Sequence, residues 1–121
     1  MLLRFVSRVF LVCLALLLPV GCSSAGTSGS TATVKVSQLP AEARQTVALI
    51  DQGGPFPYAK DGVVFGNYEK LLPEQKRGYY HEYTVRTPGS RDRGARRIVT
   101  GQGGEIYYTD DHYKSFRTVL R

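Results

Sequence analysis

One carboxylate and a group of arginines stand close together in the second half of the chain. Glu82 lies in Gly-Tyr-Tyr-His-Glu-Tyr-Thr-Val, and the positions that follow hold five arginines: Arg86, Arg91, Arg93, Arg96 and Arg97. The planar guanidinium group matches the geometry of phosphate, and a single glutamate leaves most of this positive charge without a partner. These residues favour a site for an anionic substrate. The alternative is a surface ion pair, which would contribute little to stability.

The stretch also has the pattern of a β-hairpin, with its loop at residues 87–92. If Arg86 lies opposite Arg93 across that loop, Thr84 pairs with Ala95, and Glu82 falls opposite Arg97. Side chains alternate along a strand, so the glutamate and the two arginines of the second strand then share one face. The hairpin therefore predicts a patch that holds one acid and two guanidinium groups.

A carboxylate beside a bound phosphate can take a proton from a hydroxyl that attacks phosphorus. In RNA this hydroxyl is the ribose 2′-OH, which is already held next to its own 3′-phosphate. The reaction also needs a proton donor for the departing 5′-oxygen, and the chain has two histidines. His112 lies in a loop between strands, where an imidazole can reach a site. His81 alternates to the face opposite Glu82, so we expect it to be structural.

One helix and several short strands must position these side chains. Residues 40–50 carry apolar positions at helical spacing, and the helix ends at Gly53-Gly54. The expected strands follow this helix: 63–65, 79–86, 93–100, 106–109 and 115–120. This order predicts an α+β fold with one N-terminal α-helix packed on an antiparallel β-sheet.

The start of the chain has the layout of an export signal, which we assign to residues 1–22. A positively charged beginning precedes an apolar run at 9–20, and this run is too short for a membrane span. Gly21-Cys22 resembles a lipoprotein box with Cys22 as the lipidated residue, although Pro19 is atypical of that motif. The alternative is ordinary cleavage after Ala25. Either route predicts an extracellular protein or a cell-surface lipoprotein.

Residues 23–33 are nearly all Ser, Gly, Thr and Ala, which predicts a flexible tether before a single domain at 34–121. The two cysteines, Cys13 and Cys22, both precede this domain, so it must rest on its hydrophobic core alone. The whole chain has a formal net charge of +6 at pH 7. That balance favours an anionic partner such as nucleic acid or a membrane surface.

The folded region resembles the secreted guanyl-specific microbial ribonucleases of the barnase superfamily, and most closely the group of ribonuclease Sa. The resemblance runs from about Leu39 to Phe116. It is carried by ordered blocks: Leu-Pro-x-Glu-Ala, Gly-Pro-Phe-Pro-Tyr, Asp-Gly-Val-Val-Phe-x-Asn-x-Glu, Gly-Tyr-Tyr-His-Glu-Tyr-Thr-Val, Thr-Pro-Gly-x-Arg-x-Arg-Gly-x-Arg-Arg-Ile and Asp-His-Tyr.

The resemblance implies the microbial ribonuclease fold and a role for each residue of the constellation. Glu82 would be the general base, His112 the general acid, and Arg93 and Arg97 the clamp on the phosphate, with Tyr113 lining the phosphate site. The first step would form a 2′,3′-cyclic phosphate and the second would hydrolyse it. Neither a metal nor another cofactor is expected.

The resemblance also implies a guanine pocket, made by Phe65, Gly66, Asn67, Tyr68 and Glu69. The carboxylate of Glu69 would accept hydrogen bonds from the ring N–H and the amine of guanine, and adenine does not offer this pair. Backbone N–H groups of 66–68 would meet the guanine oxygen, and Phe65 would support the base by stacking. Tyr58 and Arg91 are expected to line the pocket or the path of the phosphates.

These inferences predict an exported endoribonuclease that cleaves single-stranded RNA on the 3′ side of guanosine. The alternative is a catalytically inactive RNA-binding surface lipoprotein with the same fold. We also expect a monomer and, because an active ribonuclease endangers its own cell, a cytoplasmic inhibitor resembling barstar.

Two departures from the family bear on these expectations. The domain lacks the disulfide that commonly joins the chain ends, which predicts lower stability. Gly66 stands where a larger residue is usual in the family, which predicts looser base selectivity.

Overall fold

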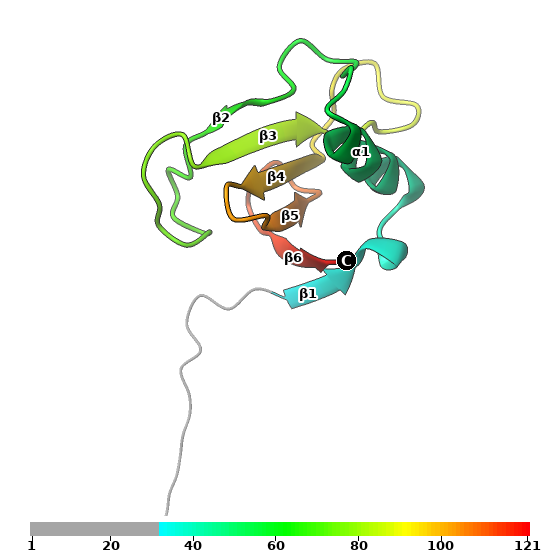
Figure 1. Cartoon of the computed structure of the whole chain (residues 1–121). Coiled ribbons are helices and arrows are strands. Elements are labelled where there is room, and N and C mark those ends of the chain that lie inside the picture. Colours follow the sequence, from blue (N-terminus) through cyan, green and yellow to red (C-terminus); the bar gives the residue numbers. More distant parts are fainter. Residues whose placement is uncertain (1–31) are drawn as a thin grey trace, which may run out of the picture. The chain divides into compact units, whose positions relative to one another are not determined.

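The computed structural model describes residues 32–121, which form one α-helix, a short 3-10 helix and a six-stranded sheet (Figure 1). In chain order the elements are β1 (Ala32–Lys35), η2 (Val36–Gln38), α1 (Ala41–Gln52), β2 (Val63–Phe65), β3 (Tyr80–Thr84), β4 (Arg97–Gly101), β5 (Ile106–Thr109) and β6 (Arg117–Leu120). The order across the sheet is β1-β6-β5-β4-β3-β2. The α+β class with one helix on a sheet is confirmed.

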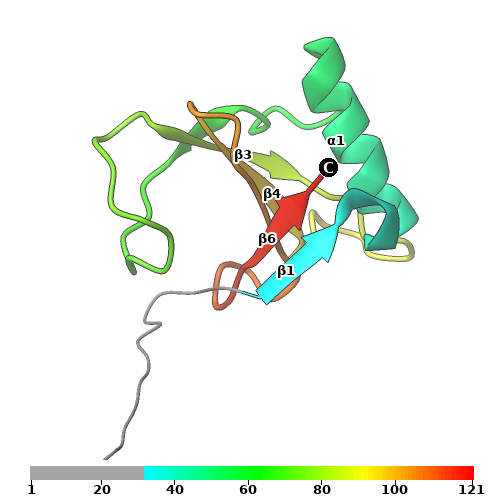
Figure 2. The same ribbon diagram turned by 60° about the horizontal axis from the view of Figure 1, so that its bottom comes forward.

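The sheet has one pair of strands that the sequence did not indicate. β1 pairs with β6 in parallel, with Ala32 opposite Arg117 and Lys35 opposite Leu120, whereas every other neighbouring pair is antiparallel. Figure 2 shows the β1 and β6 arrows side by side and pointing the same way. The sheet is therefore mixed.

Strand β1 begins at Ala32, so residues 32 and 33, which we expected in the tether, lie in a strand. The predicted signal at 1–22, its Cys22 and the tether up to residue 31 lie outside the described residues. Within residues 32–121, the single α-helix is too short and too polar to cross a membrane.

Helix α1 forms close to its predicted place and packs on the sheet through its apolar side. Pro40 precedes it, and Gly53 ends it with φ of 84°, a left-handed conformation that glycine adopts at little cost. Ala43 and Val47 are buried in a cluster with side chains from the sheet. That cluster is completed by Leu39, Val85, Ile98, Ile106, Tyr108 and Val119.

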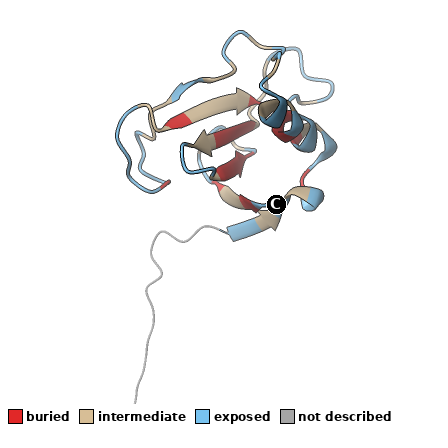
Figure 3. Ribbon diagram, viewed as in Figure 1, coloured by how far each residue is buried: buried red, intermediate tan, exposed pale blue. Residues whose placement is uncertain are grey.

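The other face of the sheet carries a second, aromatic-rich cluster. It consists of Leu72, Tyr80, Val99, Tyr107 and Phe116. Neighbours Ile98 and Val99 of β4 belong to different clusters, as expected for side chains that alternate across a sheet. Figure 3 shows the buried residues concentrated in β4, in β5 and on the inner side of α1. The central strands are thus covered on both faces.

The β3–β4 hairpin forms, but its predicted register is wrong. Thr84 lies opposite Arg97 and Glu82 lies opposite Val99, which is a shift of two residues from the expected pairs. Regular pairing ends early because the intervening segment makes its own turns, in which Gly94 has φ of 69° and donates its N–H to Asp92. An even shift keeps each side chain on its face, so the predicted grouping of acid and arginines survives.

Candidate active site

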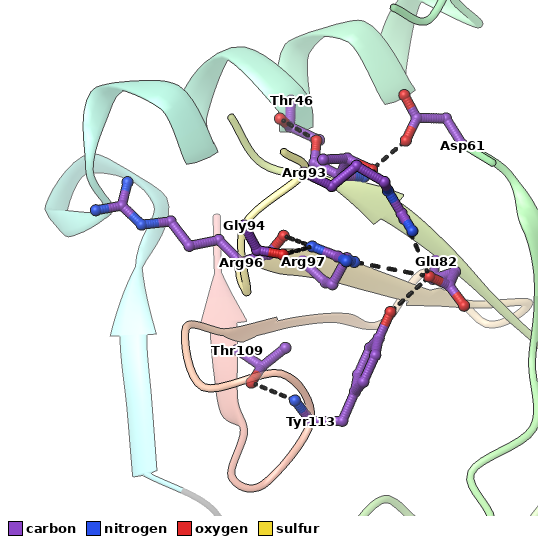
Figure 4. Close-up of polar contacts among 10 residues, drawn as sticks. Thr46, Asp61, Glu82, Arg93, Gly94, Arg96, Arg97, Thr109 and Tyr113 are labelled. Carbon is purple, nitrogen blue, oxygen red and sulfur yellow. Dashed lines mark hydrogen bonds and ion pairs between the residues drawn. The ribbon is translucent and has the colours of Figure 1, made fainter. Parts of the chain in front are cut away.

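Three donor side chains from different parts of the fold converge on the carboxylate of Glu82 (Figure 4). Its Oε1 accepts a hydrogen bond of 2.5 Å from the hydroxyl of Tyr113. The same oxygen lies 3.6 Å from Nη2 of Arg93 and 3.8 Å from Nε of Arg97. The Glu82 side chain is 17% exposed, so a substrate can still reach it. The structure therefore brings together the acid and both predicted clamp arginines.

Arg97 is held almost entirely inside the protein. Its side chain is 3% exposed, and its Nη1 donates to the carbonyls of Gly94 and Arg96 at 3.0 and 2.8 Å. Its Nε is buried without a hydrogen-bond partner in residues 32–121. A buried N–H donor without a hydrogen-bond partner is costly, and the acid nearest to this one is Glu82, whose Oε1 lies 3.8 Å away.

Arg93 reaches the same place from the hairpin loop. Its Nε donates to Oγ1 of Thr84 at 3.1 Å, which fixes the direction of the guanidinium group. Its Nη2, like Nε of Arg97, is buried and has no hydrogen-bond partner among the described residues. Two guanidinium donors thus point into one small volume, an arrangement that fits the oxygens of a phosphate.

Tyr113 joins the carboxylate of Glu82 to the side of the site where the guanine pocket is expected. Its ring stacks on Phe65, with ring centroids 5.0 Å apart and planes at 29°. Burial, followed by the hydrogen bond to Glu82, raises the pKa of the Tyr113 hydroxyl. The hydroxyl therefore stays protonated at neutral pH and serves as a donor to Glu82.

His112 and Tyr113 lie in a loop that is held by Asp111. The Asp111 carboxylate accepts hydrogen bonds from Oγ1 of Thr109 at 2.8 Å, from both N–H and hydroxyl of Ser115 at 3.0 and 2.6 Å, and from the N–H of Lys114 at 3.1 Å. The Ser115 hydrogen bond is the main reason that the pKa of Asp111 falls from 3.8 to about 2. We did not predict this positioning role, although aspartate side chains often close turns by bonding to nearby backbone N–H groups.

His112 occupies an exposed position over the same site. Its φ is 59°, and its backbone N–H donates to the carbonyl of Ala95 at 2.9 Å. The imidazole lies against Tyr113, with centroids 4.9 Å apart. By contrast, Nδ1 of His81 is 2.8 Å from the carbonyl oxygen of Gly62, which fits the structural place expected for it.

A cleft of about 350 Å³ joins the catalytic residues to the expected guanine pocket. It is lined by Val64, Phe65, Gly66, Tyr68, Glu69, Glu82, His112 and Tyr113. The carboxylate of Glu69 makes no hydrogen bond or ion pair with any residue of 32–121, so its acceptors face the cleft unused. Val64 was not predicted to line the site, because an exposed valine next to a strand end carries no chemical signal.

Asn67 belongs to the expected guanine loop but does not line this cleft. Its side-chain amide donates to the carbonyl of Leu72 at 2.9 Å, and its Oδ1 accepts the N–H of Leu72 at 3.1 Å. Its φ is 54°, a left-handed conformation that asparagine tolerates better than most residues. The amide therefore closes the loop that presents Tyr68 and Glu69.

Gly66 and Tyr68 are packed in a way that favours glycine. A Cβ on Gly66 would lie 2.5 Å from the ring of Tyr68, which is too close for any side chain without movement of that ring. The ring is 80% exposed, and its hydroxyl accepts a hydrogen bond of 2.9 Å from Nη1 of Arg77. Gly66 therefore sets the place of an aromatic ring at the edge of the cleft.

Two residues that we expected at the pocket or the phosphate path do not line this cleft. Tyr58 lines a separate hollow beside α1, and Arg91 is exposed in the hairpin loop, away from the lining of the cleft. Both belong to irregular segments, whose positions depend on long-range packing.

Comparisons with known proteins agree with this geometry. A family model for ribonuclease matches residues 22–120. Guanyl-specific ribonuclease St of Saccharopolyspora erythraea is 58% identical over 87 residues, covering 72% of this chain and 86% of that protein. From Kitasatospora aureofaciens, ribonuclease Sa is 59% identical over 88 residues (72% of this chain, 92% of that protein), and ribonuclease Sa3 is 67% identical over 84 residues (69% and 60%).

Solved structures of ribonuclease Sa2 share the fold. The crystal structure with guanosine-2′-cyclophosphate has a TM-score of 0.73 and 52% identity, covering 75% of this chain and 97% of that one. The structure with 3′-GMP has a TM-score of 0.69 and 50% identity, covering 74% and 96%. On the extent of these matches, the chain belongs to the ribonuclease family, in the group of the guanyl-specific ribonucleases.

Proposed function

We propose that the chain is an endoribonuclease that cleaves single-stranded RNA on the 3′ side of guanosine through a 2′,3′-cyclic phosphate. The observation that carries this proposal is the pair of buried guanidinium donors of Arg93 and Arg97, which lie beside Glu82 and have no hydrogen-bond partner in residues 32–121. The names of the curated relatives and the guanosine ligands of the ribonuclease Sa2 structures support the same activity.

In the first step, Glu82 takes the proton of the guanosine 2′-OH, and that oxygen attacks the neighbouring phosphorus. The bond from phosphorus to the 5′-oxygen of the next nucleotide breaks, and His112 gives that oxygen a proton. Arg93 and Arg97 stabilise the negative charge that builds up on the phosphate oxygens. The Tyr113 hydroxyl holds Glu82 in place throughout, because it remains a donor.

In the second step, water replaces the departed nucleotide and the two residues exchange roles. The imidazole of His112 takes a proton from the water, which attacks the cyclic phosphate. Glu82, now protonated, returns a proton to the 2′-oxygen. The product is a fragment that ends in a guanosine 3′-phosphate, and both side chains regain their starting state.

Guanine is selected at the other end of the cleft. The unused carboxylate of Glu69 accepts the ring N–H and the exocyclic amine of guanine, and Phe65 supports the base. Adenine leaves this carboxylate without those donors, so a site that hydrogen-bonds guanine in this way discriminates against adenine.

The place of action follows from the sequence at 1–22. Export through this signal puts the enzyme outside the cell, either released after cleavage or held at the surface by a lipid on Cys22. The proposed enzyme acts as a monomer, and a barstar-like inhibitor protects the RNA of the producing cell.

A synthetic RNA with a single guanosine tests the proposal directly. The exported chain is incubated with it in EDTA, and the fragments are analysed by mass. One cut after the guanosine with a 2′,3′-cyclic phosphate end is expected. Cuts after every base would overturn the role of Glu69, for which Glu69→Gln is the shape-matched control. Intact RNA from folded protein would instead favour the inactive RNA-binding alternative.

A further inference from the structure

The turn that carries Tyr68 and Glu69 is held at its base, but its tip is exposed. The backbone N–H of Lys70 donates to the carbonyl of Asn67 at 3.0 Å, which closes a four-residue turn with Tyr68 and Glu69 in the middle. Leu72, which is 2% exposed, anchors this loop through its two hydrogen bonds with Asn67. In Figures 1 and 2 the loop lies at the side of the sheet away from α1. Because Tyr68 is 80% exposed, burial does little to fix the direction of its ring.

The Tyr68 side chain borders two hollows. With Phe65 and Glu69 it lines the cleft of about 350 Å³. With Asn67 and Glu74 it also lines a hollow of about 170 Å³. Space is therefore available to the ring in more than one direction, and a further contact is needed to hold it at the cleft.

Arg77 supplies such a contact from the segment that leads into β3. Its Nη1 donates a hydrogen bond of 2.9 Å to the hydroxyl of Tyr68. Its Cζ lies 5.8 Å from the centroid of the same ring, which is within the range of a cation–π contact. Arg77 is exposed and makes no ion pair with any residue of 32–121, so no acid in this part of the chain competes for its guanidinium group.

The position of this ring matters for a base that enters the cleft. An aromatic side chain contributes to binding when a base lies against its face. A ring that is free to turn must first lose that freedom, which weakens binding, whereas a ring already held in place avoids this loss. A contact outside the cleft can thus raise the affinity for the base without touching it.

We propose that Arg77 is a positioning residue for guanine binding. It holds the ring of Tyr68 at the edge of the cleft, where the ring lies against the bound base. Arg77 acts through Tyr68 and contacts neither the base nor the phosphate. The inference rests on the proposed function, because it concerns the base of the same substrate.

The test compares KM and kcat for GpU, and the Kd of 3′-GMP, among variants of the exported chain. Arg77→Met keeps a long side chain and removes its donors. It should raise KM and the Kd of 3′-GMP by about threefold and change kcat less, because the ring contacts the base before and during the reaction. Lys76→Met removes the same charge from the adjacent exposed position and should leave both constants unchanged. Urea unfolding should give the same stability for both variants, which separates positioning from folding.

A double-mutant cycle shows whether Arg77 acts through the ring. In a Tyr68→Ala background there is no ring to hold, so adding Arg77→Met should have no further effect on KM or Kd. The inference is overturned if Arg77→Met raises these constants by the same factor with and without the ring, because the guanidinium group would then act on RNA directly. Equal effects of Arg77→Met and Lys76→Met would also overturn it.

The two readouts keep this inference separate from the proposed function. Absence of any GpU cleavage by the unaltered enzyme would overturn the proposed function. The Kd of 3′-GMP would still decide the role of Arg77, because binding of this nucleotide requires no catalysis.

Discussion

The hydroxyl of Tyr113 and Oε1 of Glu82 are joined by a hydrogen bond of 2.5 Å, and Tyr113 also stacks on Phe65. One aromatic residue therefore fixes the catalytic carboxylate while it packs against a wall of the guanine pocket. In the proposed mechanism, the residues for base recognition and for proton transfer are therefore linked through the Tyr113 side chain.

Replacing Glu82 with glutamine removes the base and keeps the size of the side chain. We expect Glu82→Gln to lower kcat for the first step by about 10²- to 10⁴-fold, which is the usual contribution of a positioned general base. The affinity for RNA should change little, since both arginines remain. Single-turnover cleavage and a binding titration measure the two effects, and full activity would refute the assignment of Glu82.

Removing the buried guanidinium group should affect rate, affinity and stability together. In Arg97→Ala the carbonyls of Gly94 and Arg96 lose a donor and Glu82 loses a cation. We expect a loss of about 2 to 4 kcal/mol in the free energy of unfolding, from unpaired buried groups. Urea unfolding and kcat/KM give the two readouts. Arg97→Ala with normal stability would contradict the buried position.

The loop that carries His112 should depend on the charge of Asp111. Its pKa is depressed to about 2, so the stabilisation it provides is present above about pH 4 and is lost as the pH falls toward 2. Asp111→Ala should lower stability at pH 7 and flatten the stability profile over that interval. It should also lower kcat, because His112 and Tyr113 lose their support. Urea unfolding of both proteins at pH 7, 4 and 2.5 measures how stability depends on pH. The same dependence in Asp111→Ala and in the unaltered protein would contradict the role of Asp111.

The packing of Gly66 against Tyr68 should be visible as a coupling between the two positions. Gly66→Ala places a Cβ against the Tyr68 ring, which must move. We expect KM for a guanosine substrate to rise several-fold and the preference for guanine over adenine to fall. In a Tyr68→Ala background there is no ring to displace, so adding Gly66→Ala should have no further effect. Additive effects of the two substitutions would exclude the coupling.

The grouping of Glu82 with Arg97 could be predicted because it depends only on how side chains alternate along a strand. Alternation along β3 and β4 puts Glu82 and Arg97 on one face for any even register, so an error of two residues did not separate them. Phe65, Gly66, Tyr68 and Glu69 were identified by family resemblance and line one cleft with His112, whose loop position had already singled it out.

Other features depend on contacts between distant segments, which no local pattern encodes. The parallel pairing of β1 with β6 joins the two ends of the domain. The position of Tyr58 depends on Asp61, whose Oδ2 accepts the N–H of Tyr58. The other oxygen of Asp61 accepts the N–H of Thr84 at the end of β3. The contact of Arg77 with Tyr68 arises from the fold of the loop between them.

The two arms of the phosphate clamp differ in how they are supported. Arg97 belongs to β4 and is locked by backbone carbonyls, whereas Arg93 extends from the hairpin loop and is tied by a single hydrogen bond to Thr84. Loops open at far lower free energy than central strands. The Arg97 side of the clamp is thus fixed by the sheet, and we expect the Arg93 side to move first when the hairpin loop opens.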